Sequence, residues 1–312
     1  MVTKEFPIIK FRWLFLAISG LLIVSSVVAL VVWGLHFGVE FTGGSLMNVH
    51  FEERVPSREE IVSKLSDQDL GDITIQSADE KNLILRFKAV DEDKHQEILK
   101  KIQEITPTQE EQFTSIGPVI GNELKQKAAW AVGLAIVGIM LYIAWAFRRV
   151  SKPVSSWQYG FIVALVALLH DVIIPLGVFA AMGHYIGTEI NVAFIAAILT
   201  ILGFSVHDSI VVFDRTRENL RRIFDKSFAE IVNTSLNQTL GRSLATSTTV
   251  LLTIAAIAVF GGPAVFDFAL ALFIGIAIGT YSSIFVAGPL LIEFQKIASV
   301  VGLKRGNRRK YR

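Results

Sequence analysis

Six apolar stretches, each close to 20 residues or longer, divide this sequence of 312 residues. They occupy roughly 13–35, 128–147, 157–181, 190–213, 244–260 and 266–292. A helix needs about 20 mostly apolar residues to cross a bilayer. The chain is 52% hydrophobic and only 19% charged, which is too apolar for an ordinary soluble domain. The sequence therefore predicts an α-helical polytopic membrane protein with six transmembrane helices.

Basic residues alternate between the two ends of the predicted spans. The connector between spans two and three carries Arg148, Arg149 and Lys152, whereas 182–189 and 261–265 contain no Lys or Arg. Basic residues also gather in 214–243 and at the end of the chain. The positive-inside rule then places both termini in the cytoplasm. We expect a cytoplasmic N-terminus with the first span (1–35), an extracytoplasmic head (36–127), five further spans (128–292) and a basic cytoplasmic tail (293–312).

The predicted head has the pattern of a small α/β domain. Segments 45–51, 72–77, 82–88 and 111–117 are typical of strands, and 56–65 and 92–105 of helices. The order βαββαβ predicts a ferredoxin-like arrangement. No catalytic constellation is visible in it, so we expect a mechanical or binding head. We expect no metal and no cofactor, and the chain has no cysteine.

Two aspartates lie inside predicted spans, Asp171 in the third and Asp208 in the fourth. A charged side chain at the bilayer centre costs about 2.5 kcal/mol or more unless it is paired or hydrated. Arg242 begins the fifth span at a depth comparable to Asp208, so the two form an ion pair if spans four and five pack together. A guanidinium favours the ionised carboxylate and burial opposes it, which suits a group that binds and releases protons.

Other interpretations of these residues stay open. Both aspartates are structural if they only accept hydrogen bonds, and Asp171 then caps a break before Pro175. His207 is a further candidate for the proton path, although it lies about 100° around the helix from Asp208. Gly43 and Gly44 form either a hinge at the base of the head or a plain turn. The small residues of "GIAIG" (275–279) indicate close helix packing.

Several motifs together resemble the SecF family of protein-export membrane proteins, within the SecD/SecF family of the resistance-nodulation-division superfamily. They are "FGVEFTGGS" (37–45), "ALLHD" (167–171), "GFSVHDSIVVFDRTREN" (203–219), "SLNQTLGRSLATSTT" (235–249) and "FGGP" (260–263). The resemblance covers essentially the whole chain. It carries the family's intramembrane aspartate onto Asp208 and its fifth-span arginine onto Arg242. His207 stands where the family usually has Asn, and Glu40 where it usually has Asp.

What the resemblance implies is a subunit without enzymatic activity in the bacterial cytoplasmic (inner) membrane. It pairs with SecD, associates with the SecYEG channel and YajC, and uses the proton-motive force to move secretory polypeptides outward. Two other classes remain open: a passive scaffold of the translocase, and half of a small-molecule or lipid exporter of the same superfamily. We expect no nucleic-acid partner, and the sequence shows no nucleotide-binding loop, zinc-protease motif or nucleophile elbow.

Overall fold

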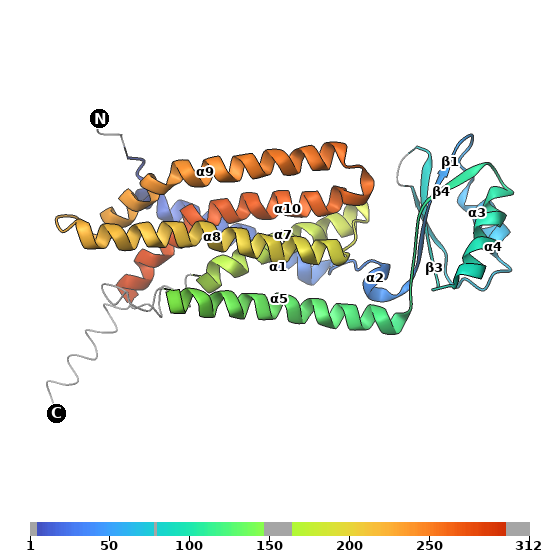
Figure 1. The fold of residues 1–312 in the computed structure, drawn as a ribbon, viewed down its shortest axis with the longest axis horizontal. Helices are drawn as coiled ribbons and strands as arrows, with labels where there is room; N and C mark the ends of the chain where they lie inside the picture. Colours follow the sequence, from blue (N-terminus) through green and yellow to red (C-terminus); the bar gives the residue numbers. More distant parts are fainter. Residues whose placement is uncertain (1–4, 78–79, 147–163, 298–312) are drawn as a thin grey trace, which may run out of the picture. The chain divides into compact units, whose positions relative to one another are not determined.

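The computed structural model describes residues 5–77, 80–146 and 164–297. The chain divides into two compact units (Figure 1). Residues Phe37–Trp130 form one unit, and the described residues on either side of that segment form the other. The predicted basic connector with Arg148, Arg149 and Lys152, and the basic residues of 304–312, lie outside the described residues.

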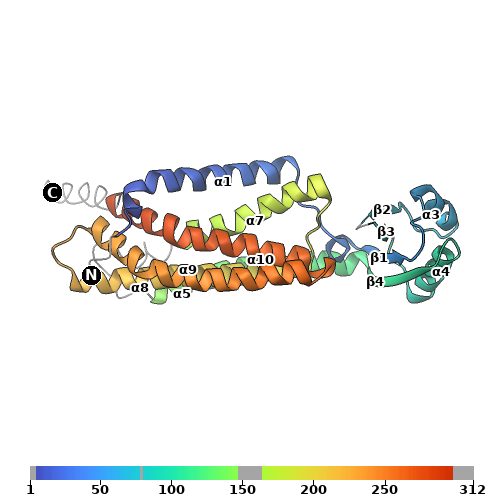
Figure 2. The ribbon, with the colours of Figure 1, turned by 90° about the horizontal axis from the view of Figure 1, so that it is seen from above.

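The six predicted spans are confirmed as helices long and apolar enough to cross a membrane. They comprise α1 (Arg12–Val32) with the short η1 (Ile8–Phe11) before it, α5 (Pro118–Ala146), α7 (Ala164–Ile186), α8 (Val192–Arg222), α9 (Phe228–Phe260) and α10 (Pro263–Ser282). A π-helical segment, η3 (Ser283–Ala287), follows α10, and helix continues to residue 297. Figure 2 shows α1, α7, α8, α9 and α10 running lengthwise in one bundle.

Three helices extend well beyond the apolar stretches that predict them. α5 begins at Pro118 rather than near residue 128. α8 and α9 take up most of 214–243, the segment between the predicted spans 190–213 and 244–260, and leave only 223–227 between them. The reason lies in helix capping, because Ser227 and Glu230 form a capping box that starts α9 before its apolar part. Hydropathy marks where a helix becomes polar. The helix continues past that point when the backbone N–H and C=O groups at its ends have hydrogen-bond partners.

Small residues allow the bundle helices to approach closely, as "GIAIG" predicts. A Cβ built on Gly275 of α10 would lie 2.1 Å from Cδ1 of Ile201 on α8. One turn further, a Cβ on Gly279 would lie 3.1 Å from Cβ of Ser205. Backbone contact of this kind is how membrane helices associate without a hydrophobic driving force between them. The packing holds α8 and α10 in the register on which the polar groups described below depend.

The unit Phe37–Trp130 contains the predicted ferredoxin-like domain. Its elements are β1 (Gly44–Phe51), α3 (Arg58–Leu65), β2 (Thr74–Ser77), β3 (Asn82–Phe87), α4 (Glu92–Gln103) and β4 (Thr108–Ile116). The sheet is antiparallel with strand order β2-β3-β1-β4. Alternate residues of β1 and β3 face α3 and α4 and form the core, which includes Met47, Val49, Phe51, Leu83, Leu85, Phe87, Ile61, Leu65, Ile98 and Ile102.

The glycine pair at the start of β1 is needed for close packing inside this unit. Gly43 and Gly44 both have positive φ, at 77° and 128°. A Cβ on Gly43, just after the short α2 (Val39–Thr42), would lie 2.7 Å from Cα of Pro118 at the start of α5. Only glycine fits both the conformation and the space. The role of this pair as a hinge stays a prediction.

Candidate functional site

Asp208 lies on the inner face of α8 and is 4% exposed. Its Oδ1 accepts a hydrogen bond of 3.3 Å from the hydroxyl of Ser243 on α9, itself 1% exposed. Its Oδ2 has no hydrogen-bond partner within the described part of the chain. A buried carboxylate with one hydroxyl donor and one free oxygen has an open position for a proton.

Arg242 is not the partner of Asp208 in this structure. Its neighbour Ser243 faces Asp208, and because successive helical residues are about 100° apart, the Arg242 side chain is directed elsewhere and is exposed. Among the described residues, no ion pair joins Asp208 to Arg242. The predicted pairing is therefore corrected to a hydrogen bond with Ser243. Arg242 and Asp208 lie at comparable depth, as expected, but the side of α9 that faces Asp208 carries Ser243 and not Arg242.

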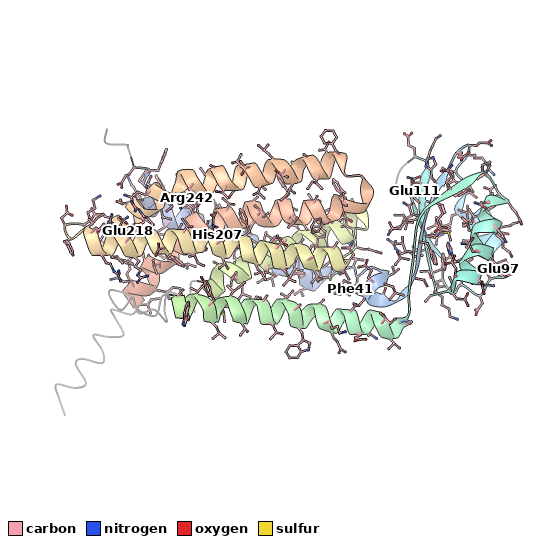
Figure 3. The ribbon with its side chains drawn as sticks, viewed as in Figure 1. Phe41, Glu97, Glu111, His207, Glu218 and Arg242 are labelled. Atoms are coloured by element: carbon pink, nitrogen blue, oxygen red, sulfur yellow. The ribbon has the colours of Figure 1, made fainter. Side chains whose placement is uncertain are left out.

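A charged pocket lies one helical turn from this hydrogen bond. It has a volume of about 300 Å³ and lies between α8 and α9, lined by Val211, Asp214, Arg215, Glu218, Gln238, Thr239 and Arg242. Val211 is three residues beyond Asp208 and Thr239 four before Ser243, so both lie on the neighbouring turn. Figure 3 shows Arg242 and Glu218 toward the same end of this helix pair. Polar groups therefore extend from the pocket toward the buried carboxylate.

His207, labelled in Figure 3, is exposed on α8 and directly precedes the buried Asp208. It makes no hydrogen bond within the described residues to the buried polar groups of the bundle. Because adjacent helical positions point about 100° apart, this agrees with the separation expected from the sequence. The structure leaves His207 outside the buried cluster.

Asp171 is the centre of a second polar cluster that joins three elements. Its Oδ1 lies 2.9 Å from Nδ1 of His170 on α7. Its Oδ2 accepts hydrogen bonds from Ser205 on α8 and, at 2.8 Å, from Ser282 at the end of α10. Asp171, His170 and Ser282 are completely buried. Ser205 is also one turn before Asp208, so α8 contributes a polar group to each cluster.

The helix break that would have given Asp171 a capping role is absent. α7 runs without interruption through Pro175. Because proline has no N–H, Pro175 cannot bond the carbonyl of Asp171 four residues earlier, yet neighbouring helices tolerate such a gap in a span. The alternative role of Asp171 as a cap at Pro175 is therefore wrong. The serines that bind it were missed, although the pair Ser282-Ser283 in an otherwise apolar stretch was a visible signal.

Within the described residues, no group of three His, Cys, Asp or Glu side chains is arranged to hold a metal ion. The chemistry available at both clusters is that of carboxylate, imidazole and hydroxyl groups, all of which exchange protons. Two buried carboxylates in helices long enough to span a membrane are costly to retain for structure alone.

Known proteins match the chain over nearly its whole length. The family described as "Protein export membrane protein SecD/SecF, C-terminal" matches residues 94–297. The protein translocase subunit SecF of Thermobaculum terrenum is 40% identical over 303 residues, covering 92% of this chain and 93% of that protein. The chain belongs to the SecF family. Its role in protein export follows from that membership, and SecF of Haemophilus influenzae is also 36% identical, with 97% and 89% covered.

Solved structures of SecDF share the fold of this SecF-family chain. The crystal structure of SecDF from Thermus thermophilus, described as a translocon-associated membrane protein, has a TM-score of 0.82 and 30% identity. It covers 95% of this chain, which in turn spans 39% of that longer chain. A SecDF structure in a super-membrane-facing form has a TM-score of 0.70 at the same identity, with 98% and 41% covered.

Proposed function

We propose that this SecF-family subunit uses the proton gradient across the bacterial cytoplasmic membrane to promote protein export, and that Asp208 is the group that binds and releases the proton. The observation that carries the proposal is the open oxygen of Asp208. The carboxylate is buried inside a spanning helix, its Oδ1 accepts a hydrogen bond from the neutral hydroxyl of Ser243, and its Oδ2 has no hydrogen-bond partner within the described residues. Within the described part of the chain no ion pair holds the carboxylate in the ionised state, so a proton at Oδ2 removes an unfavourable buried charge.

The pocket between α8 and α9 supplies the proton route on one side of Asp208. Its lining holds Asp214, Glu218 and Arg242, which attract and order water one turn from Ser243. Arg242 acts here as a positive charge at the mouth of the route rather than as an ion-pair partner. It limits the time a proton stays in the pocket and so favours transfer to or from the buried carboxylate.

Protonation changes the contact between α8 and α9. The ionised carboxylate accepts from Ser243, whereas the protonated form donates through Oδ2 to a new acceptor and holds Ser243 less strongly. Two protonation states therefore favour two helix arrangements, which is what coupling between a gradient and a motion requires. The extracytoplasmic head follows the motion through α1 and α5, between which it is inserted, with Gly43 and Gly44 as the hinge.

The partner in this proposal is SecD, because the SecDF chains that share the fold are longer than this one and combine both names. The SecYEG channel, YajC and the secretory polypeptide are the further partners that the family resemblance implies. Basic residues at the α8–α9 end, such as Arg221, Arg222 and Lys226, support a cytoplasmic position for that end and for both termini. The proton gradient replaces any cofactor.

The test is export of a secretory protein into membrane vesicles that contain this chain and SecD, with and without an imposed proton gradient. Asp208→Asn keeps the size of the side chain and removes its proton. Asp225→Asn, in the exposed 223–227 connection, is the matched control. We expect Asp208→Asn to lose the gradient-dependent part of export while the complex still assembles. Unchanged gradient dependence would refute the proposal and favour a passive scaffold.

A further inference from the structure

The buried cluster around Asp171 is not used by the mechanism proposed for Asp208, and its hydrogen bonds define what it can do. Both oxygens of Asp171 have partners: Nδ1 of His170 lies at Oδ1, and the hydroxyls of Ser205 and Ser282 donate to Oδ2. We assign the state in which Nδ1 of His170 carries the ring proton and donates to Oδ1, so that the carboxylate is ionised and accepts at both oxygens. The other ring nitrogen of His170 then has a lone pair.

That other nitrogen, Nε2 of His170, is the unusual atom of the cluster. It belongs to a side chain with no exposed surface, and it has no hydrogen-bond partner within the described residues. The pair in this state has a net charge of −1 inside a spanning bundle, which is unfavourable. Adding one proton at Nε2 converts the pair to an imidazolium beside a carboxylate, with no net charge.

We infer that His170 and Asp171 form a second proton-binding site, which holds one exchangeable proton on Nε2 of His170. The inference rests on the proposed proton-driven function and extends it to a second site beside Asp208. In the empty state the pair is a neutral imidazole and a carboxylate. In the loaded state the imidazole has gained one proton, no bond between heavy atoms has changed, and the pair is neutral overall.

The surroundings of the pair contain few competing charges. The elements packed against α7 are α1, α8, α10 and η3. The apolar part of α1 (13–32) and the whole of η3 contain no charged residue. α8 contributes Asp208, one turn beyond Ser205, and the exposed His207. α10 contributes Tyr281, whose ring centroid is 6.3 Å from that of His170 and whose hydroxyl donates to the carbonyl of Phe15.

The position of the pair links its charge to Asp208 and to helix geometry. Ser205 on α8 donates to Asp171 of α7 and lies one turn before Asp208. Ser282 directly precedes the π-helical segment Ser283–Ala287, which packs against α8. π-helical turns are rare and are frequently found at functional sites, where they let a helix change register locally. A charge change of the His170–Asp171 pair therefore acts on the two elements, α8 and α10, that also surround Asp208.

The direct test is ¹⁵N nuclear magnetic resonance of histidine-labelled full-length chain, purified with its partner SecD and reconstituted in lipid. The chain contains six histidines, and His170→Gln assigns the signal of interest by its loss. We expect the ring of His170 to change from neutral imidazole to imidazolium as the pH is lowered from about 8 to about 5. A ring that stays neutral throughout would overturn the inference, and the titration itself is measured on the unaltered chain.

Export provides the second readout. We expect His170→Gln to lower the gradient-dependent part of export about tenfold and to leave the gradient-independent part unchanged. His184→Gln, the same change at an exposed position of α7, is the matched control, and an equal loss in that variant would overturn the inference. Asp208→Asn tests the proposed function separately, because gradient dependence in that variant decides the role of Asp208 whether or not His170 gains a proton.

Discussion

Replacing Gly275 by alanine places a methyl group where Ile201 of α8 already lies. The new Cβ would be 2.1 Å from Cδ1 and 2.5 Å from Cγ1 of Ile201. Ile201 has no exposed surface, so its side chain has no solvent into which to move. The substitution therefore forces α8 and α10 apart or pushes Ile201 out of its rotamer.

The magnitude follows from two opposing contributions to the free energy of unfolding. Overpacking of a filled interior costs about 1–3 kcal/mol. Alanine in place of glycine inside a helix stabilises the folded state by about 0.5–1 kcal/mol. Gly138→Ala in α5 is the matched control, since no atom lies within 4 Å of its new Cβ and it keeps only the gain. The two variants differ by the packing contribution, about 1–3 kcal/mol, which is about a 5–150-fold difference in the folding equilibrium.

The assay is reversible unfolding of the full chain in mixed micelles, followed by tryptophan fluorescence and circular dichroism. We expect Gly275→Ala to be less stable than Gly138→Ala by the stated amount. Adding Ile201→Val removes Cδ1, the atom nearest the new methyl group, and should recover part of the loss as a coupling in a double-mutant cycle. Equal stability of the two alanine variants would refute the close approach of α8 and α10.

Three further predictions concern other parts of the chain. The hydrogen bond from the backbone N–H of Ser57 lowers the pKa of Glu60 below its ordinary value of 4.5. The ionised carboxylate therefore stabilises the start of α3 above that pH, and the stabilisation is lost as the pH falls through the lowered pKa. Amide hydrogen exchange of the first turn of α3 should speed up in acid. Asn237→Ala removes two hydrogen bonds to the backbone of Phe6, at 2.7 and 2.9 Å, and should speed exchange and proteolysis of residues 5–10. Leu85→Ala, in the head core, should destabilise the head by about 2–5 kcal/mol without changing exchange in the bundle.

The fold could be predicted from the sequence because its elements have strong, local signals. Apolar length alone indicates the six spanning helices, and alternation with polar turns indicates the ferredoxin-like head. Helix ends were less predictable, since the hydropathy of 214–243 falls while capping at Ser227 keeps the chain helical. A polar extension of a spanning helix has no signal in a hydropathy pattern.

The candidate site was predicted in part. Asp208 and Asp171 stood out because charged residues inside apolar stretches are rare, and the structure buries both. The contact of Asp208 with Arg242 was wrong, because depth along two helices does not fix their relative rotation. α9 is rotated so that Ser243, and not Arg242, contacts Asp208. Serines that serve as donors to a buried carboxylate resemble ordinary helix residues in a sequence, and only the packing of α7 against α10 distinguishes Ser282.

Proton flux is the quantity that tests the central claim most directly. Liposomes containing this chain with SecD, and a pH-sensitive dye inside, report proton entry when a gradient is imposed during export of a secretory substrate. The account predicts substrate-dependent proton entry with the unaltered chain and its loss in Asp208→Asn, with Asp225→Asn unaffected. Equal proton entry in the unaltered chain and in Asp208→Asn would contradict the account.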